Sequence, residues 1–465
     1  MTSAVSGQSA ETVRSSVVFA VLLPILAGYV AVFVYAMEHT TYDVWGALWV
    51  APVLVAISAP ILLRYARGEP NPLMGRLLVA ALVLKLAAAV PRYYMVAYLY
   101  GYGDSYGYAG TAIELRQDFL AGNFNLVALG VDSRTGTQFV EIVTGVVYTI
   151  IGPSFIGGFL FFSWLSFWGL FFFYRAFRVA IPDGDTTRYA LLLFLLPSML
   201  FWPSSIGKEA WMTLVLGIAT YGAVLLLARQ PGATVYLAVG LAGILAVRPH
   251  VAALVVAGLA LGYLLRIRSG PQVPLGRIRT VFGLAAIGIV MFFVIRRVAA
   301  FFELNEFSLE TAAQTIEYAE GQSAQGGSEF SGGRPSFSNL PINLVTVLFR
   351  PFPFEVHNVP ALLAALEGTV LMALFVLSWP RLRTIPGRLR KQPYVAFCLT
   401  YTVLFCLVFS AFQNFGILAR ERVMVYPFVL VLLALPAATA SRRLVRQGGV
   451  EPHAVEEDYA AATRE

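Results

Sequence analysis

Four short polar stretches interrupt an otherwise apolar sequence, and each of them carries a lysine or an arginine. They are "WPSSIGKEAW" (202–211), "AVRPHVAAL" (246–254), "LFRPFPFEVHN" (348–358) and "FQNFGILARERV" (412–423). The planar guanidinium of arginine can form two parallel hydrogen bonds with a phosphate, so arginines from several segments predict a phosphate-binding site. The residues predicted to bind a substrate phosphate are Lys208, Arg248, Arg350, Arg420 and Arg422.

The same stretches hold further side chains suited to such a site. Glycine and serines precede Lys208 at the start of an apolar run, and this combination presents backbone N–H groups and positive charge to an anion. An ordinary interfacial turn with solvated charges is the alternative. Ionisable residues between apolar runs, such as Arg248 and His250, usually pair or line a polar cavity. We also expect Glu209 and His250 to be catalytic groups, with Glu355, His357 and Asn414 as polar neighbours.

A third candidate catalytic residue, Asp104, lies in the stretch "GYGDSYGYAG" (101–110). A carboxylate facing a half-buried cavity would serve as a general base, because partial desolvation raises the pKa of such a group. The alternative is a cap or turn residue, since a helix-like stretch follows directly. The nearby Tyr102, Tyr106 and Tyr108 fit an interfacial aromatic belt or a platform for stacking a sugar.

Two charges fall in the middle of apolar runs. Lys85 lies in "ALVLKLAAAV" and Glu367 lies in "LLAALEGTVL". An unpaired charge near the centre of a bilayer is costly, so we predict that these two residues form a buried ion pair. A role in proton relay is the alternative.

The composition of the chain indicates the class of protein to which these residues belong. Of the 465 residues, 58% are hydrophobic and 13% are charged, whereas soluble domains have roughly 25% charged residues. Apolar runs of about 20 residues match a hydrocarbon thickness of about 30 Å. We therefore predict an all-α integral membrane protein, one polytopic domain over 1–465, with about 12 transmembrane helices. The expected spans are 17–37, 44–63, 75–98, 155–174, 189–205, 209–228, 234–248, 251–265, 279–299, 359–379, 393–412 and 423–440. Two of them, 234–248 and 251–265, are short, and the alternative for these two is a broken pair that meets at Arg248-Pro249.

The distribution of basic residues predicts the orientation. The formal net charge is +7, and arginines cluster in alternate connections between the apolar runs. Because such clusters favour the cytoplasm, we expect a cytoplasmic N-terminus and a cytoplasmic tail at 447–465. Two long connections, 99–154 and 300–358, then face outward. The second contains the Gly/Ser-rich "EGQSAQGGSEFSGGRPSFSN", either a linker or a mobile flap. The apolar segment 138–152 reads as an interfacial or re-entrant helix. The expected location is the cytoplasmic membrane of a bacterium, with multiple passes.

Several kinds of chemistry find no support in the sequence. It has no Walker motif, no GxGxxG after a strand, no HExxH and no CxxC, so we predict no cofactor. A divalent metal is left open, because Asp104, Asp118 and Glu141 could supply oxygen ligands. The net positive charge has a topological cause, and no nucleic acid partner is expected. Cys398 and Cys406 share one apolar run and are expected to be small buried side chains.

The outer-loop stretch "GDSYGYAGTA" resembles the GT-C class of polyprenyl-phosphate-dependent glycosyltransferases, whose first outer loop carries a catalytic aspartate. On that resemblance Asp104 is the matching position. "FWPSSIGKEA", "VRPH", "LFRPFPFEVHN" and "NFGILARERV" resemble bacterial surface-polysaccharide polymerases of the O-antigen polymerase kind. That resemblance implies that outward arginines handle undecaprenyl-pyrophosphate sugars, with Arg248, Arg350, Arg420 and Arg422 as the counterparts.

The expected function is therefore a membrane glycosyltransferase or polysaccharide polymerase. Its expected partners are a polyprenyl-linked sugar lipid, a sugar or glycan acceptor and the surrounding membrane lipids. Two other functions compete with it. A transporter or flippase of lipid-linked saccharides would use Lys85 and Glu367 as coupling residues, and a non-catalytic scaffold for envelope assembly would use none of these residues.

Overall fold

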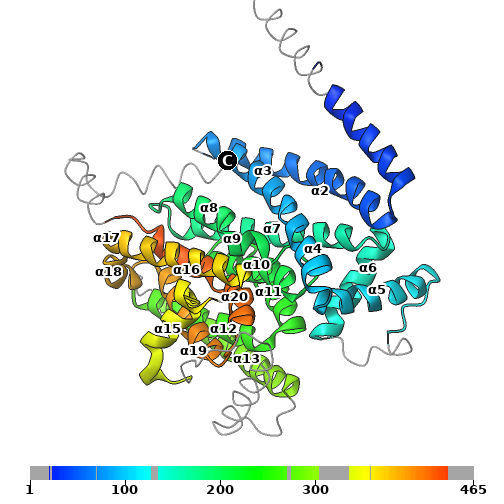
Figure 1. Ribbon diagram of the computed structural model, residues 1–465. Coiled ribbons are helices and arrows are strands. Elements are labelled where there is room, and N and C mark those ends of the chain that lie inside the picture. The colour runs from blue at the N-terminus through cyan, green and yellow to red at the C-terminus, as the bar shows by residue number, and fades with distance from the viewer. Residues whose placement is uncertain are drawn as a thin grey trace, which may run out of the picture. The chain divides into compact units, whose positions relative to one another are not determined.

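The computed structural model describes residues 20, 23–69, 71–126, 135–269, 274–302, 335–356 and 358–437, and its regular elements are helices (Figure 1). This confirms the all-α fold class. Helix is the expected form for a chain this apolar, because a helix satisfies its own backbone hydrogen bonds in hydrocarbon.

Within the described ranges, seven helices are long and apolar enough to cross a membrane. An eighth candidate is a pair bent by 110°, made of Trp379–Leu389 and α19 (Pro393–Phe409). This fits a multi-pass membrane protein, but the predicted count of about 12 is not confirmed. The seven helices are α2 (Tyr42–Arg67), the run α3–α4–η1 (Leu73–Ala87, Ala89–Tyr94 and Met95–Tyr100), α7 (Phe155–Ala180), α10 (Lys208–Ala228), α12 (Pro249–Ser269), α13 (Pro274–Phe301) and α16 (Val359–Leu377).

The difference in count arises from helices that form where spans were predicted but are short. A helix of 15 residues rises only about 22 Å, less than the hydrocarbon thickness. A local backbone break divides the predicted span 189–205, because Leu196 is extended before Pro197. Arg248 is non-helical before Pro249, at the predicted boundary between 234–248 and 251–265. The short helices are α8 (Thr186–Leu195) with α9 (Pro197–Phe201), α11 (Ala233–Val247) and α21 (Tyr426–Leu433). At the first predicted span, 17–37, the structure describes a helix over Leu23–His39, and residues 17–19, 21 and 22 lie outside the described residues.

Both long connections contain helices. The first holds α5 (Asp104–Leu120) and α6 (Thr137–Ile151), and α6 is the apolar segment predicted to be interfacial or re-entrant. The second holds η3 (Phe337–Asn339), α15 (Leu340–Phe349) and η4 (Pro353–Glu355). Residues 127–134 and 303–334, which include most of the Gly/Ser-rich segment, lie outside the described residues, as does the tail at 447–465. The side of the membrane that each connection faces stays a prediction.

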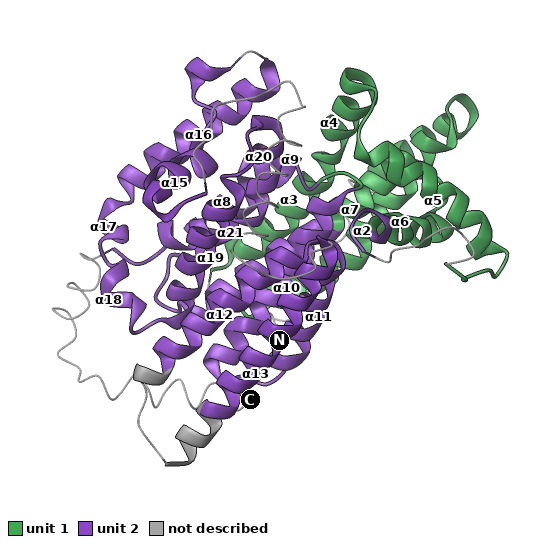
Figure 2. Ribbon diagram, turned by 90° about the horizontal axis from the view of Figure 1, so that it is seen from below, with its two compact units in different colours: residues 1–132, 140–164, 204–206 green, residues 133–139, 165–203, 207–465 purple. Residues whose placement is uncertain are grey.

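The chain divides into two compact units (Figure 2). Unit 1 contains residues 1–132, 140–164 and 204–206, and unit 2 contains 133–139, 165–203 and 207–465. In unit 1, Asp43 at the start of α2 holds other segments in place. Its carboxylate accepts hydrogen bonds from the Tyr93 hydroxyl and the Ile156 N–H, both at 2.9 Å, and Ser154 donates to its carbonyl at 2.7 Å.

In unit 2, α10 and α11 pack as an antiparallel hairpin with closely apposed backbones. A Cβ atom added at Gly222 would clash with the backbone of Leu237, and one added at Gly240 would clash with the backbone of Ala219. Small residues of this kind allow membrane helices to approach closely. The Trp211 indole donates to the Gly243 carbonyl at 3.0 Å, so the start of α10 lies beside the end of α11.

Helices α12 and α19 are also antiparallel, since Gly258 lies against Phe397 and Gly262 lies against Pro393. The start of α12 therefore lies at the same end of this pair as the last residues of α19. Because α12 directly follows α11, the start of α10, the end of α11 and the start of α12 meet at that end of unit 2. This meeting point carries Lys208, Glu209, Arg248 and His250.

Candidate functional site

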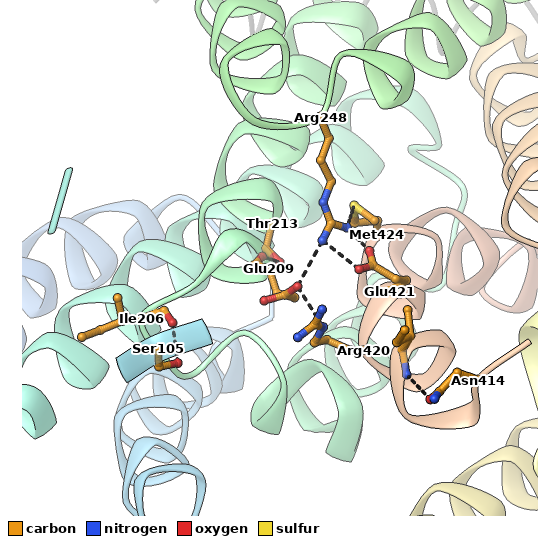
Figure 3. Close-up of polar contacts among 10 residues, drawn as sticks. Ser105, Ile206, Glu209, Thr213, Arg248, Asn414, Arg420, Glu421 and Met424 are labelled. Atoms are coloured by element: carbon orange, nitrogen blue, oxygen red, sulfur yellow. Dashed lines mark hydrogen bonds and ion pairs between the residues drawn. The ribbon is translucent and has the colours of Figure 1, made fainter. Parts of the chain in front are cut away.

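Four charged side chains in unit 2 form one cluster, which we call the charge cluster: Glu209, Arg248, Arg420 and Glu421 (Figure 3). Arg248 Nη2 lies 3.2 Å from Glu209 Oε1 and donates to Glu421 Oε1 at 2.7 Å. The same guanidinium forms an ion pair with the second oxygen of Glu421. Arg420 Nε lies 3.2 Å from Glu209 Oε1. Glu209, Arg248 and Glu421 are 7%, 9% and 4% exposed, so these charges are removed from water.

The polar stretch around residue 208 builds one side of the charge cluster. The turn before α10 contains Pro203 and ends at Gly207, whose backbone is extended, so the helix begins at Lys208. Glu209 therefore lies in the first turn of α10, where the helix dipole favours a carboxylate. Lys208 is half-buried. The non-helical backbone of Arg248, between α11 and α12, directs its side chain toward this helix start.

Helix α20 (Phe415–Glu421) builds the other side. The Asn414 side chain caps it by accepting hydrogen bonds from the N–H groups of Gly416 and Ile417, so Asn414 has a structural role at this position. The last two residues of α20 are Arg420 and Glu421, and both join the charge cluster. Four polar stretches were expected to converge. The stretch 412–423, which contains α20, directly contacts two of the others, 202–211 and 246–254.

Arg350 contacts the opposite end of α20. Its guanidinium lies over the Phe415 ring, 5.3 Å from the ring centroid. Because Phe415 and Arg420 lie near the two ends of one seven-residue helix, about 10 Å long, Arg350 and the charge cluster contact opposite ends of α20. Arg350 also pairs with Glu355, through Nε to Oε1 at 3.0 Å and to Oε2 at 3.1 Å.

The pair of Arg350 and Glu355 lies in the connection between α15 and α16. Burial by itself raises the pKa of Glu355, but hydrogen bonds from Arg350 and from the Phe352 N–H, together with the Arg350 charge, outweigh burial and lower the pKa overall. The neighbours of Glu355 therefore favour its ionised form. His357, its predicted neighbour in the site, lies outside the described residues.

Arg422 points into a different environment from that of Arg420. It begins η5 (Arg422–Met424), is 2% exposed, and donates through Nε to the Val347 carbonyl at 2.6 Å. Among the described residues its Nη2 has no hydrogen-bond partner. A role in phosphate binding therefore stays a prediction, and the contacts of Arg422 are those of a residue that fixes α15 against η5.

His250 lies beside two aromatic rings. Its ring centroid lies 5.8 Å from that of Phe302 and 6.0 Å from that of Phe409. In the part of the chain that the structure describes, its Nδ1 has no hydrogen-bond partner. The imidazole is thus not bonded to the charge cluster, although it follows Arg248 by two residues.

Asp104 belongs to unit 1, where it is exposed and is the first residue of α5. A carboxylate in the first turn of a helix is stabilised by the helix dipole, which supports the structural alternative for this residue. The next residue, Ser105, donates from its hydroxyl to the Ile206 carbonyl at 2.7 Å (Figure 3). A catalytic role for Asp104 stays a prediction.

The two charges inside apolar runs are both buried, Lys85 at 1% and Glu367 at 8% exposure. Lys85 lies on α3 in unit 1 and Glu367 on α16 in unit 2. Glu367 Oε2 accepts a hydrogen bond from the Ser198 N–H at 2.7 Å, and the Arg422 charge acts on the same carboxylate. Pairing of Lys85 with Glu367 stays a prediction.

The sequence shows Glu421 among the polar residues of the stretch 412–423, but we predicted no site role for it, and it is a central member of the charge cluster. The available signal was its position between Arg420 and Arg422, because a carboxylate between two arginines beside an apolar run needs charged partners. The predicted site was rich in positive charge, whereas the charge cluster contains two guanidiniums and two carboxylates and is formally neutral. Buried charges require compensation, which accounts for the difference.

No group of three or more His, Cys, Asp or Glu side chains in metal-binding arrangement occurs among the described residues. Both cysteines are free and buried, as expected from the sequence. Comparison of the chain with protein-family models, with curated proteins and with solved structures found no match.

Proposed function

We propose that this protein is a membrane glycosyltransferase or polysaccharide polymerase that uses polyprenyl-(pyro)phosphate-linked sugars at the extracytoplasmic face of a bacterial membrane. The observation that supports this most is the charge cluster of Glu209, Arg248, Arg420 and Glu421. Four charges at the ends of apolar helices are energetically costly, and charges within membrane helices usually serve a function. In the proposed complex the apolar lipid tail lies between such helices, with its phosphate at this depth.

Arg420 is the guanidinium best suited to meet the phosphate. Its side chain is 30% exposed, compared with 10% for Arg248, so one side of the cluster is accessible through Arg420. A guanidinium binds carboxylate and phosphate oxygens with the same fork geometry. In the proposed complex, a phosphate oxygen takes the place of Glu209 beside Arg420, and Arg248 supplies a second positive charge behind it.

The proposed reaction is glycosyl transfer. The oxygen of an acceptor hydroxyl attacks the anomeric carbon of the lipid-linked sugar and forms the new glycosidic bond. The bond from that carbon to the phosphate oxygen breaks, and the lipid (pyro)phosphate leaves with the electron pair. The hydroxyl proton passes to a carboxylate. Glu209 is the candidate in the charge cluster, and Asp104 is the separate candidate that the sequence suggests. Preorganised arginine charge stabilises the departing phosphate.

Mass spectrometry of lipid-linked saccharides tests this proposal, using cells that lack the gene and carry wild type, Asp104→Asn, Glu209→Gln or Arg420→Gln. We expect single repeat units to accumulate without the gene, wild type to clear them, and the variants of catalytic or phosphate-binding residues to fail at normal expression. Asp183→Asn, which removes the exposed carboxylate of an ion pair outside the charge cluster, is the matched control and should rescue. An unchanged lipid-linked pool in the deletion strain would rule out glycosyl transfer.

One observation favours transport of lipid-linked saccharides as the second candidate. Glu367 is buried within the candidate span α16, and in the described part of the chain its Oε1 has no hydrogen-bond partner. Intramembrane carboxylates of this kind mark proton or ion pathways in transporters. Loss of function in Glu367→Gln with a tolerant Asp104→Asn and Glu209→Gln would favour transport over glycosyl transfer.

A further inference from the structure

A basic segment joins α16 to α19 at one end of unit 2. It contains two short helices, α17 (Trp379–Leu382) and α18 (Ile385–Leu389). Residues Trp379–Leu389 are bent by 110° from α19, so the segment runs across the helix end and does not continue it. A connection between two apolar helices of a membrane protein lies at the membrane surface, because its polar backbone ends and charges require water or headgroups.

Two arginines fix this segment to a neighbouring connection. Arg381 Nη2 lies 3.0 Å from Asp185 Oδ2, and Arg381 Nη1 donates to the Leu435 carbonyl at 2.6 Å. Arg388 Nη1 lies 2.9 Å from Asp183 Oδ2. Both aspartates lie in the connection between α7 and α8, so the ends of α7 and α16 lie on the same membrane face. These contacts hold α17 and α18 in place.

Three other cations of the segment are exposed: Arg383, Arg390 and Lys391. Large apolar side chains are exposed beside them: Val376 at 70%, Leu377 at 74% and Trp379 at 60%. Cations next to exposed tryptophan and aliphatic side chains are typical of a surface at the level of lipid headgroups, where the apolar groups enter the acyl boundary and the cations meet phosphates.

We propose that Arg383, Arg390 and Lys391 bind the headgroups of anionic phospholipids, and we call these residues with Trp379 the headgroup surface. Charge complementarity favours this occupant, because exposed cations near a membrane attract anionic lipids while their neighbours dip into the same leaflet. Arg381 and Arg388 position the surface through their ion pairs, and the proposed lipid contacts are made by the three exposed cations. This inference is independent of the proposed catalytic function.

Quenching of Trp379 fluorescence by brominated lipids measures occupancy of the headgroup surface. The full-length protein is reconstituted into nanodiscs of phosphatidylcholine mixed with phosphatidylglycerol, with the bromine on one lipid or on the other. A Trp379→Phe variant supplies the signal of the remaining tryptophans for subtraction. The ratio of the two quenching curves gives the local preference for phosphatidylglycerol.

For wild type we expect phosphatidylglycerol to be preferred at Trp379, with a preference that decreases as salt screens the charges. Each cation near the surface contributes to the attraction of anionic lipid. The triple variant Arg383→Gln/Arg390→Gln/Lys391→Gln should therefore prefer phosphatidylglycerol about 10- to 100-fold less than wild type does. The charge-conserving variant Arg383→Lys/Arg390→Lys/Lys391→Arg should retain it.

A second triple variant provides a control of equal charge. Arg64, Arg67 and Arg76 are exposed basic residues of unit 1, and their replacement by glutamine should leave the preference at Trp379 unchanged. Size-exclusion elution and circular dichroism establish that each variant is folded. Equal quenching by the two brominated lipids in wild type, or an unchanged preference in the first triple variant, would overturn the proposal.

Discussion

Replacing Glu421 by glutamine tests whether the charge cluster is held together by compensation of buried charge. Glu421 is 4% exposed and accepts a hydrogen bond from Arg248 at 2.7 Å. The substitution keeps the shape of the side chain and removes its charge. Arg248, itself 9% exposed, then retains Glu209 as its carboxylate partner at 3.2 Å.

The magnitude of the expected effect follows from burial. Removing one partner of a buried ion pair costs about 3–5 kcal/mol when the remaining charge is left uncompensated. Because Glu209 still compensates part of the charge of Arg248, we expect Glu421→Gln to lower the free energy of unfolding by about 2 kcal/mol, roughly half of that range. Arg248→Gln leaves two carboxylates with Arg420 and should cost at least as much.

The variants are compared by their apparent unfolding midpoints, because membrane proteins often unfold irreversibly. All midpoints are measured in one detergent and at one scan rate. The double variant Arg248→Gln/Glu421→Gln should cost less than the sum of the single variants, by about 1–3 kcal/mol. Asp183→Asn is the control, because Asp183 is 52% exposed in its pair with Arg388 and such pairs contribute about 0–1 kcal/mol. If Glu421→Gln shifts the midpoint no more than Asp183→Asn does, charge compensation is not what stabilises the cluster.

Three further predictions test other parts of the structure. The pKa of Glu355 is lowered overall, so its stabilising contact with the Phe352 N–H should persist above the ordinary carboxyl range and be lost as pH falls through the folded-state pKa. Hydrogen exchange at the Phe352 amide should show this dependence, and Glu355→Gln should abolish it. Gly240→Ala should lower the yield of folded protein by separating α10 from α11, whereas Gly288→Ala, with no atom within 4 Å of the added Cβ, should be neutral in fluorescence-detected size exclusion. The buried Cys398 and Cys406 should resist maleimide labelling until the protein is unfolded, and rapid labelling of the native state would contradict their burial.

The sequence by itself determined the all-helical class and the approximate positions of the helices. Composition and run length were sufficient, because hydrocarbon leaves a backbone few alternatives to helix. Helices formed at nearly every predicted span, but the number of helices long enough to cross a membrane could not be deduced from those positions. Run length does not report every backbone break, and the extended backbone at Leu196 divided the predicted span 189–205 into α8 and α9. Helix α11 follows the bounds predicted for it and is shorter than a bilayer is thick.

Only the tertiary structure decided which polar residues meet. Three of the four predicted polar stretches come into contact, and Arg350, from the fourth, reaches them through Phe415 at the far end of α20. Arg420 and Arg422 are two positions apart, yet one joins the charge cluster and the other binds the Val347 carbonyl, because successive side chains leave a helical turn in different directions. Glu421 entered the cluster because a guanidinium removed from water must have a carboxylate beside it. That requirement depends on burial, which arises when distant helices pack together.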